Sequence, residues 1–286
     1  MKIITVMNTG MLRSWKTWKG IIIIWLVSLL LVSLVSMPMR SALRTGFGSS
    51  MITEKLATGI NVEVFADLGS SFGSLVSYFS VGLILVLLIG FLFNSFISGG
   101  IFGRLKKISG GFSYNEFFIT SVKYFWSFLI ISLIISLIIV FLAIVIIVIP
   151  VSVVSQSQPS SEGAAFKTGI VVTSLFLVIF PLLLLVADYA RAWQVLNDEN
   201  QCFKALGFGF RHTFRTFSYS YPLMIILLLV QGFYGWFVLS VLAVIRPVDG
   251  IGIILLFILS QFLFFLKILL RTWRYGSVTY MMELTV

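Results

Sequence analysis

Few residues of this chain are of a type that could bind a ligand or take part in catalysis, and most of these lie beside a basic residue. Gly99, Gly100 and Gly103 come just before Arg104. A glycine-rich turn beside an arginine directs backbone N–H groups at an anion, such as a lipid phosphate. The alternative is a flexible turn after an apolar segment, in which the G-x-x-x-G spacing of Gly99 and Gly103 admits a close neighbouring helix. We favour this alternative and keep the anion site as the sharper hypothesis.

A second group, Asp188, Tyr189 and Arg191, ends a long apolar run. Asp and Arg at positions i and i+3 of a helix usually form a local surface pair worth a few tenths of a kcal/mol. The alternative is a buried polar clasp between Asp188 and Arg104 at the mouth of a lipid groove, where Arg191 would join a weak site for an anionic headgroup. The sequence favours the surface pair.

The single cysteine, Cys202, and the single histidine, His212, lie in one short segment. The same segment carries three cations, Lys204, Arg211 and Arg215. We predict that the cations bind anionic lipid weakly and that His212 is solvated. One cysteine excludes an intrachain disulfide and a thiolate metal cluster. Nucleophilic catalysis needs a base within hydrogen-bond reach, oriented by a third group. The sequence therefore predicts no catalytic residue, no metal ligand and no cofactor, and we expect a protein that is not an enzyme.

The composition places these residues in a membrane protein. The chain is 59% hydrophobic and 10% charged, whereas a soluble domain has roughly a quarter of its residues charged. About 20 residues of helix cross a hydrocarbon core of about 30 Å, and the backbone groups of such a segment need partners within the segment itself. We therefore predict an all-α polytopic membrane protein. Its six spans run at about residues 20–39, 74–98, 125–150, 168–187, 218–245 and 251–270.

Basic residues are distributed unequally between the two ends of these spans. If the N-terminus is cytoplasmic, all but five of the 20 Lys and Arg residues lie on the cytoplasmic side. The positive-inside rule then predicts that both termini are cytoplasmic. A basic inner face suits an anionic leaflet, and since the cations are spread over short loops beside spans, we do not expect nucleic acid as a partner. The five exceptions are Arg40, Arg44, Lys55, Lys167 and Arg246.

Each odd-numbered span follows a short amphipathic segment, so the predicted architecture is three hairpins, each with an amphipathic helix on the inner face. An interfacial helix places its aromatic side in the headgroup region and its cations towards water. The alternative is that each segment packs on protein as an ordinary loop helix. We treat residues 1–286 as a single transmembrane domain. The three stripes are Met11, Trp15 and Trp18; Tyr114, Phe118, Val122 and Phe125; and Phe203, Leu206, Phe210, Phe214 and Phe217.

Three stretches of the chain resemble a known group of proteins. They are NSFISGGIFGRL after the second span, NEFFITSVKYFWSFL entering the third and ADYARAWQVLNDENQCFKAL after the fourth. They are similar to a widespread family of uncharacterised bacterial six-span membrane proteins, and the similarity covers the middle half of the chain. The resemblance implies a protein of the bacterial cytoplasmic (inner) membrane and brings no activity with it.

Two classes of function agree with this sequence. The first is a non-enzymatic integral membrane subunit or scaffold that contacts other envelope proteins and anionic lipid. The second is a transporter or lipid-handling protein without ion coupling. Ion-driven transport places ionisable groups at mid-membrane depth, and the spans have only Gln231 and Gln261 there. The expected partners are membrane lipids and other membrane protein subunits, and the outer loop, residues 40–73, has no assigned role.

Cysteine labelling tests the predicted orientation. A reagent that does not cross the membrane is expected to label a cysteine placed in the loop 155–163 of intact cells and to miss one placed at Gly110, because the positive-inside rule puts these positions on opposite sides. A Cys202→Ser background removes the native thiol. Labelling at position 110 in intact cells would contradict the orientation.

Overall fold

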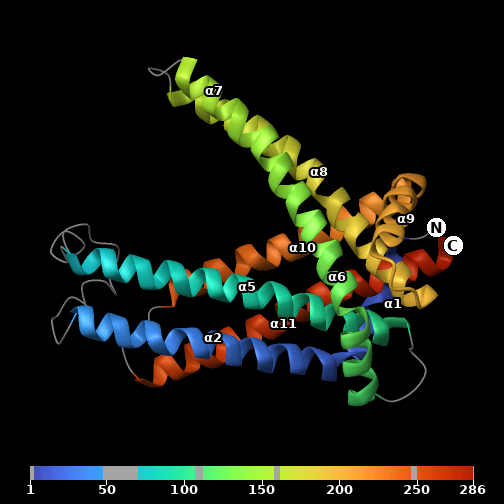
Figure 1. The fold of residues 1–286 in the computed structure, drawn as a ribbon, viewed down its shortest axis with the longest axis horizontal. Helices are drawn as coiled ribbons and strands as arrows, with labels where there is room; N and C mark the ends of the chain where they lie inside the picture. The colour runs from blue at the N-terminus through green and yellow to red at the C-terminus, as the bar shows by residue number, and fades with distance from the viewer. Residues whose placement is uncertain (1–2, 48–69, 107–111, 158–161, 246–249, 286) are drawn as a thin grey trace. The chain divides into compact units, whose positions relative to one another are not determined.

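The computed structural model describes residues 3–47, 70–106, 112–157, 162–245 and 250–285, and within these residues the regular elements are helices (Figure 1). This confirms the predicted all-helical class. The elements are α1 (Ile3–Lys16), α2 (Trp18–Phe47), α5 (Ser70–Lys106), α6 (Tyr114–Ala143), a π-helical turn η1 (Ile144–Val148), α7 (Ile149–Ser157), α8 (Glu162–Asn197), α9 (Cys202–Arg215), α10 (Phe217–Val244) and α11 (Gly250–Thr285).

Among the described residues, five helical segments are long and apolar enough to cross a membrane, and α1 with α2 makes a sixth candidate if the bent pair counts as one span. The two members of that pair meet at an angle of 65°. The chain is therefore a membrane protein with several helices capable of spanning. The five segments are Ser80–Lys106, Tyr114–Gln156, Gly163–Asn197, Phe217–Val244 and Gly250–Thr285.

Several of these helices are longer than a membrane crossing requires. α11 has 36 residues, which at 1.5 Å per residue extend about 54 Å, whereas the hydrocarbon core is about 30 Å thick. The predicted sixth span, 251–270, covers only the first part of this helix. An apolar run marks the part of a helix that suits lipid, and it does not mark where the helix ends. The remainder of α11 packs against protein.

Buried side chains concentrate at one end of the helices, in a region that we call the base. The base consists of α1, α9, residues 95–106 of α5, the beginnings of α6 and α10, the end of α8 and the second half of α11. One of its apolar clusters joins Val6 of α1, Leu223 and Leu227 of α10 and Met281 of α11, each 1% exposed. The base thus unites helices from both ends of the chain.

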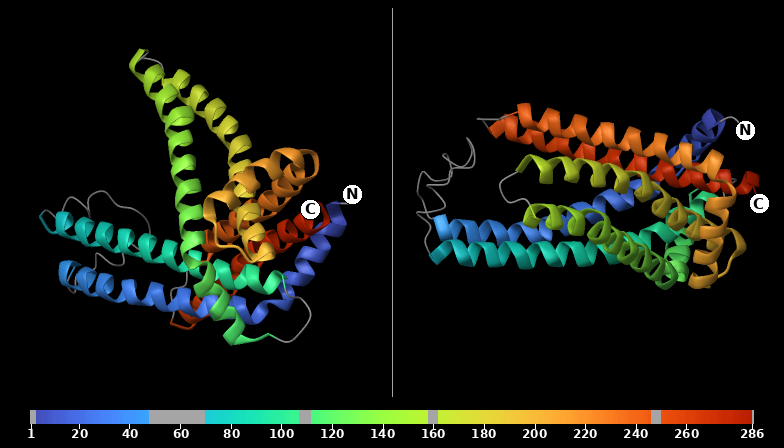
Figure 2. Two further views of the ribbon diagram at one scale, coloured as in Figure 1. Left: turned by 45° about the vertical axis from the view of Figure 1, so that its right-hand side comes forward. Right: turned by 90° about the horizontal axis from the view of Figure 1, so that it is seen from above.

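Contacts divide the chain into two compact units. One comprises Met1–Ile22 and Ser95–Val286 and contains the whole base; the other, Ile23–Asn94, contains most of α2 and the first part of α5. Within the first unit, the hairpin of α6, α7 and α8 and the hairpin of α10 and α11 both start from the base, and their far ends separate (Figures 1 and 2). Most of the predicted outer loop, residues 48–69, lies outside the described residues.

α1 crosses the second half of α11 through small residues. A Cβ added to Gly10 would lie 2.6 Å from the backbone nitrogen of Ser277, and one added to Gly276 would lie 2.7 Å from the carbonyl oxygen of Gly10. Beside this crossing, both terminal nitrogens of Arg13 donate to the Glu283 carboxylate, at 2.9 and 2.7 Å. The two ends of the chain are therefore joined by close backbone contact and by a bidentate ion pair.

The three predicted amphipathic segments take two forms. α1 and α9 are separate helices, whereas the middle segment is the first part of α6 and continues into the span without a break. A separate helix before the third span is therefore wrong. Both observed breaks fall at a threonine, Thr17 or Thr216, whose hydroxyl donates to a carbonyl three or four residues earlier, at 2.7 Å in each case. Such bonds compete with the helical backbone pattern, and they mark where α1 and α9 end.

Gly10→Ala tests the crossing of α1 and α11. The added methyl group has no space beside the Ser277 backbone, so we expect a loss of about 1–3 kcal/mol of stability, the usual cost of overpacking. Gly232→Ala in α10 is the matched control, because nothing lies within 4 Å of the Cβ that it adds. Thermal unfolding in mild detergent, followed by tryptophan fluorescence, measures both. A Gly10→Ala protein as stable as the control would contradict the close crossing.

Candidate functional site

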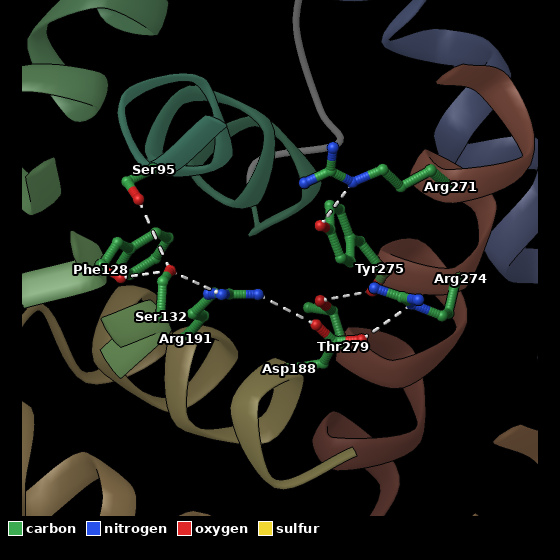
Figure 3. A network of polar contacts seen from close by, with 9 residues as sticks. All are labelled: Ser95, Phe128, Ser132, Asp188, Arg191, Arg271, Arg274, Tyr275 and Thr279. Carbon is green, nitrogen blue, oxygen red and sulfur yellow. Dashed lines mark hydrogen bonds and ion pairs between the residues drawn. The ribbon is translucent and has the colours of Figure 1, made fainter. Parts of the chain in front are cut away.

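A buried ion cluster lies in the base, where α8 passes α11 (Figure 3). Asp188 of α8 is 1% exposed. Its Oδ1 lies 3.2 Å from Nη1 of Arg191, one turn further along α8, and its Oδ2 lies 3.0 Å from Nε of Arg274 in α11. Both arginines are themselves less than a tenth exposed. One carboxylate therefore joins two helices through two guanidinium groups.

Arg191 carries the network into α6 and α5. Its Nη2 donates to the Ser132 hydroxyl at 2.9 Å, and that hydroxyl donates to the Phe128 carbonyl at 2.6 Å. Ser95 of α5 lies 3.5 Å from the same hydroxyl. Polar side chains of four helices thus meet around one arginine (Figure 3).

Tyr275 extends the cluster along α11. Its hydroxyl accepts a hydrogen bond from Nε of Arg271 at 2.7 Å, and the guanidinium of Arg274 lies 5.1 Å from the centre of its ring. The ring of Phe102 in α5 lies 4.9 Å away. A cation near an aromatic ring is attracted by the negative charge of the ring face. Tyr275, 1% exposed, therefore offers two arginines a hydroxyl and an aromatic surface.

Among the described residues, the buried part of this cluster consists of two arginines and one carboxylate. Two buried arginines, Arg191 and Arg274, share the single carboxylate of Asp188, and a third, Arg271, is partly exposed beside them. Removing one partner of such a buried group leaves an uncompensated charge and costs about 3–5 kcal/mol. The arrangement therefore suits holding helices in a fixed register.

The structure changes the interpretation of Asp188 and Arg191. They form an i, i+3 pair, but the pair is buried, so the predicted surface pair is wrong. The carboxylate is bound by Arg191 and Arg274 and joins α8 to α11. The alternative of a buried polar clasp is therefore confirmed in its burial, whereas its predicted partner Arg104 is wrong. The sequence does not predict the ion pair of Arg274 with Asp188, because Arg274 reads there as one of the cations of the inner face. Its partner Asp188 lies in a helix distant in sequence, and such a pairing leaves no local pattern.

The glycines of the predicted anion site pack against a helix. Gly99, Gly100 and Gly103 lie within α5. An added Cβ would lie 3.1 Å from the Ser121 backbone at Gly99, 2.5 Å from the Ser121 hydroxyl at Gly100 and 2.7 Å from the Thr120 hydroxyl at Gly103. This is the close helix contact that the G-x-x-x-G spacing indicates. Arg104, which follows them, lines a cavity of about 450 Å³ together with Lys106, Glu116 and Asp198.

The end of α8 is capped and held by α6. Asp198 has a φ of 59°, in the left-handed region, and the N–H of Glu199 donates to the Gln194 carbonyl at 3.0 Å, as in a Schellman helix end. Lys123 and Tyr124 of α6 donate to the Asp198 carboxylate at 2.6 and 2.5 Å. These hydrogen bonds, that of Lys123 first, lower the pKa of Asp198. The connection from α8 to α9 is therefore anchored on α6.

His212 is buried, and the prediction of a solvated histidine is wrong. It is 4% exposed, and its ring stacks on Phe208, with 5.1 Å between ring centres, while Tyr189 meets it edge-on at 4.7 Å. Its Nε2 lies 3.1 Å from the Thr285 hydroxyl. Burial, and then the nearby charge of Arg215, lower the pKa of His212. α9 therefore turns this histidine towards the protein.

The three predicted cations of α9 lie on its exposed side. Lys204 forms an ion pair with Glu199 at 2.8 Å and lies 5.4 Å from the centre of the Trp193 ring. Arg211 and Arg215 are exposed further along the helix. The predicted site residues thus separate into an ion cluster, a glycine contact beside a cavity, and the face of α9.

Comparison with protein-family models, with curated proteins and with solved structures finds no match for this chain. Among the described residues, no group of three or more His, Cys, Asp or Glu side chains is placed to hold a metal ion. Function is accordingly inferred from the ion cluster, the face of α9 and the surface of the spans.

Asp188→Asn tests the ion cluster. The amide keeps the shape of the side chain but leaves Arg191 and Arg274 buried without a countercharge, so we expect a loss of about 3–5 kcal/mol of stability. Asp198→Asn is the matched control, because its side chain is 63% exposed, and we expect it to lose much less. Thermal unfolding of both variants in mild detergent makes the comparison. Equal losses would contradict the role of Asp188.

The lowered pKa of His212 predicts a pH-dependent stability. An unfolded histidine has a pKa of about 6.5, so as the pH falls below that value the unfolded chain gains a proton before the folded protein does, and stability falls. The loss continues until the pH reaches the lower pKa of the folded state. Melting temperatures between about pH 7.5 and about pH 5.5 measure the effect. His212→Gln should show a smaller decrease than wild type, and identical decreases would refute the assignment.

Proposed function

We propose that this protein is a non-enzymatic membrane subunit or scaffold, which contacts other envelope proteins through exposed faces of its spans and anionic lipid through its base. The low burial of the spans is the observation that supports this most directly. Within the apolar segment of α10 only 6% of residues are buried inside the protein, and in α8, the most buried span, 28% are. A helix in a closed bundle buries one whole face.

The exposed surface of α10 suits a partner helix. Leu229, Leu239 and Val244 are 67% to 82% exposed. Because lipid tails are as apolar as these side chains, helices associate in membranes by close backbone packing, which small residues permit. Gly232 and Gly235 lie on the same helix, and nothing lies within 4 Å of a Cβ added to either. A neighbouring helix therefore has room to approach the backbone of α10.

The base supplies the fixed platform that a scaffold requires. The ion cluster ties α8 to α11 and α6, and the crossing at Gly10 ties α1 to α11. Asp188, Arg191 and Arg274 are buried and form ion pairs with one another, which supports a role in holding the helices together. The spans extend from this platform with most of their surface available.

The proposed location is the bacterial cytoplasmic membrane, with the base and both termini on the cytoplasmic side. The excess of Lys and Arg at this end supports the orientation, and the bacterial location rests on the sequence resemblance. Trp15, Trp18 and Phe214 are 47% to 66% exposed around the base. Aromatic side chains in such positions suit the headgroup layer, which supports a membrane boundary at the edge of the base.

A transporter or lipid-handling protein has less support. Gln231, one of the two amides expected at mid-membrane depth, donates to the Leu270 carbonyl at 3.3 Å. This bond joins α10 to α11. The cavity beside Arg104 lies at the base end of α5, away from the middle of the spans. Neither feature provides a polar route across a membrane.

Photo-crosslinking in intact membranes tests the scaffold proposal. A photoreactive amino acid at Leu229 is expected to give a discrete adduct with another membrane protein, because this side chain is 67% exposed, whereas one at Leu227, 1% exposed, is expected to react only within the chain. Mass spectrometry of the adducts identifies the partner. Lipid adducts alone at Leu229, Leu239 and Val244 would overturn the scaffold proposal and favour the lipid-handling alternative.

A further inference from the structure

Helix α9 has three faces of different chemistry. One face is buried against the protein and consists of Ala205, Leu206, Gly209, His212 and Thr213. A second face is aromatic and exposed: Phe203 is 73% exposed and Phe214 66%. At 100° per residue, the cations Lys204, Arg211 and Arg215 lie on a third face, about 60° to 120° round the helix from Phe203 and Phe214.

We propose that anionic phospholipid binds along α9, with its acyl chains against Phe203 and Phe214 and its phosphate at Arg211 and Arg215, and that this lipid stabilises the ion cluster of α8. The proposal rests on the membrane orientation proposed above. To the anionic lipid proposed there it adds a binding face and an effect on the base.

The position of α9 places this face at the membrane surface. Its two neighbours in the chain, α8 and α10, are both candidate spans. The link from α8 runs from Asn197 to Cys202, and the link to α10 is Thr216 alone. α9 therefore lies at the level where two spans leave the membrane. An exposed aromatic face beside a cationic face is what a helix in the headgroup layer presents to lipid.

The chemistry of the two exposed faces favours lipid over a protein partner. Arginine binds phosphate oxygens with two parallel hydrogen bonds, and each basic residue near an anionic leaflet gains attraction from the surface charge. The phenylalanine side chains require an apolar environment directly beside those phosphates. A phospholipid provides both within one molecule, and the adjoining spans already require a bilayer at this level.

The buried face of α9 connects such binding to the ion cluster. A Cβ on Gly209 would lie 2.6 Å from the Val186 carbonyl oxygen and 3.3 Å from the Ala190 side chain, so the helix rests on the backbone of α8. His212 lies against Tyr189, the residue after Asp188. α9 thus covers the turn of α8 that carries the cluster. A ligand that binds only this folded arrangement raises its stability by mass action.

The position of the lipid on α9 is tested with the whole chain in lipid nanodiscs. Single cysteines replace Phe214 or Arg211 in a Cys202→Ser background and carry a fluorophore, and lipids with a nitroxide on the upper part of the acyl chain quench it. We expect stronger quenching at position 214 than at position 211. Equal quenching at both positions, or protection of position 214 from lipid, would overturn the proposal.

The effect on stability is tested by melting in nanodiscs of phosphatidylcholine with and without phosphatidylglycerol. Wild type is expected to melt higher with the anionic lipid and Arg211→Gln/Arg215→Gln to lose most of this increase. Arg211→Lys/Arg215→Lys is expected to keep more of it than the glutamine variant, because lysine retains the charge but not the paired hydrogen bonds. No increase in wild type, or an increase that survives in the glutamine variant, would refute lipid stabilisation. Crosslinking at Leu229 is independent of these measurements, so failure of the scaffold proposal and failure of the α9 proposal are distinguishable.

Discussion

Asp188 is buried and forms ion pairs with two guanidinium groups. These ion pairs restrict how the helices of the base can pack. A carboxylate that is 1% exposed is stable only when its charge is compensated. Compensation comes from Arg191 in the same helix and from Arg274 in α11. Arg191 in turn uses Ser132 of α6. Sliding α6, α8 or α11 by one turn would break an ion pair or a buried hydrogen bond, so these helices have one register.

The rest of the base follows from this register. With α11 fixed against α8, its far half meets α1, and the close approach at Gly10 and Gly276 is possible because neither residue has a side chain. The same device recurs where Gly209 of α9 meets the α8 backbone. Polar bonds and glycine contacts thus concentrate at one end of the helices. Among the described residues, the spans are tied to one another by single hydrogen bonds, such as that from Gln231 to the Leu270 carbonyl, and much of their surface remains available for lipid or for another protein.

Apolar length predicts the spanning helices, and helical periodicity predicts α9, but neither predicts which face of α9 is buried. In a soluble protein the apolar stripe of a helix faces the core, and in a membrane protein lipid competes for that stripe. Small and polar residues then make the protein contact. The prediction that His212 lies in water follows from its position away from the phenylalanine stripe, yet that side includes Ala205 and Gly209, which are buried, Gly209 against α8. The clasp partner Arg274 was missed for a related reason, since pairing across helices distant in sequence leaves no local pattern.

Burial of arginines also bears on how the charge asymmetry is understood. Arg13, Arg191 and Arg274 are less than a tenth exposed, so they add little to the charge that the folded base shows to a membrane. They still count towards orientation, because the positive-inside rule acts on the segments that flank the spans while the chain is inserted, before the base is formed. The exposed cations of α9 act both during insertion, when they affect orientation, and in the folded protein, where they face the membrane. The whole set of basic residues therefore bears on topology, whereas only those that folding leaves at the surface bear on lipid binding.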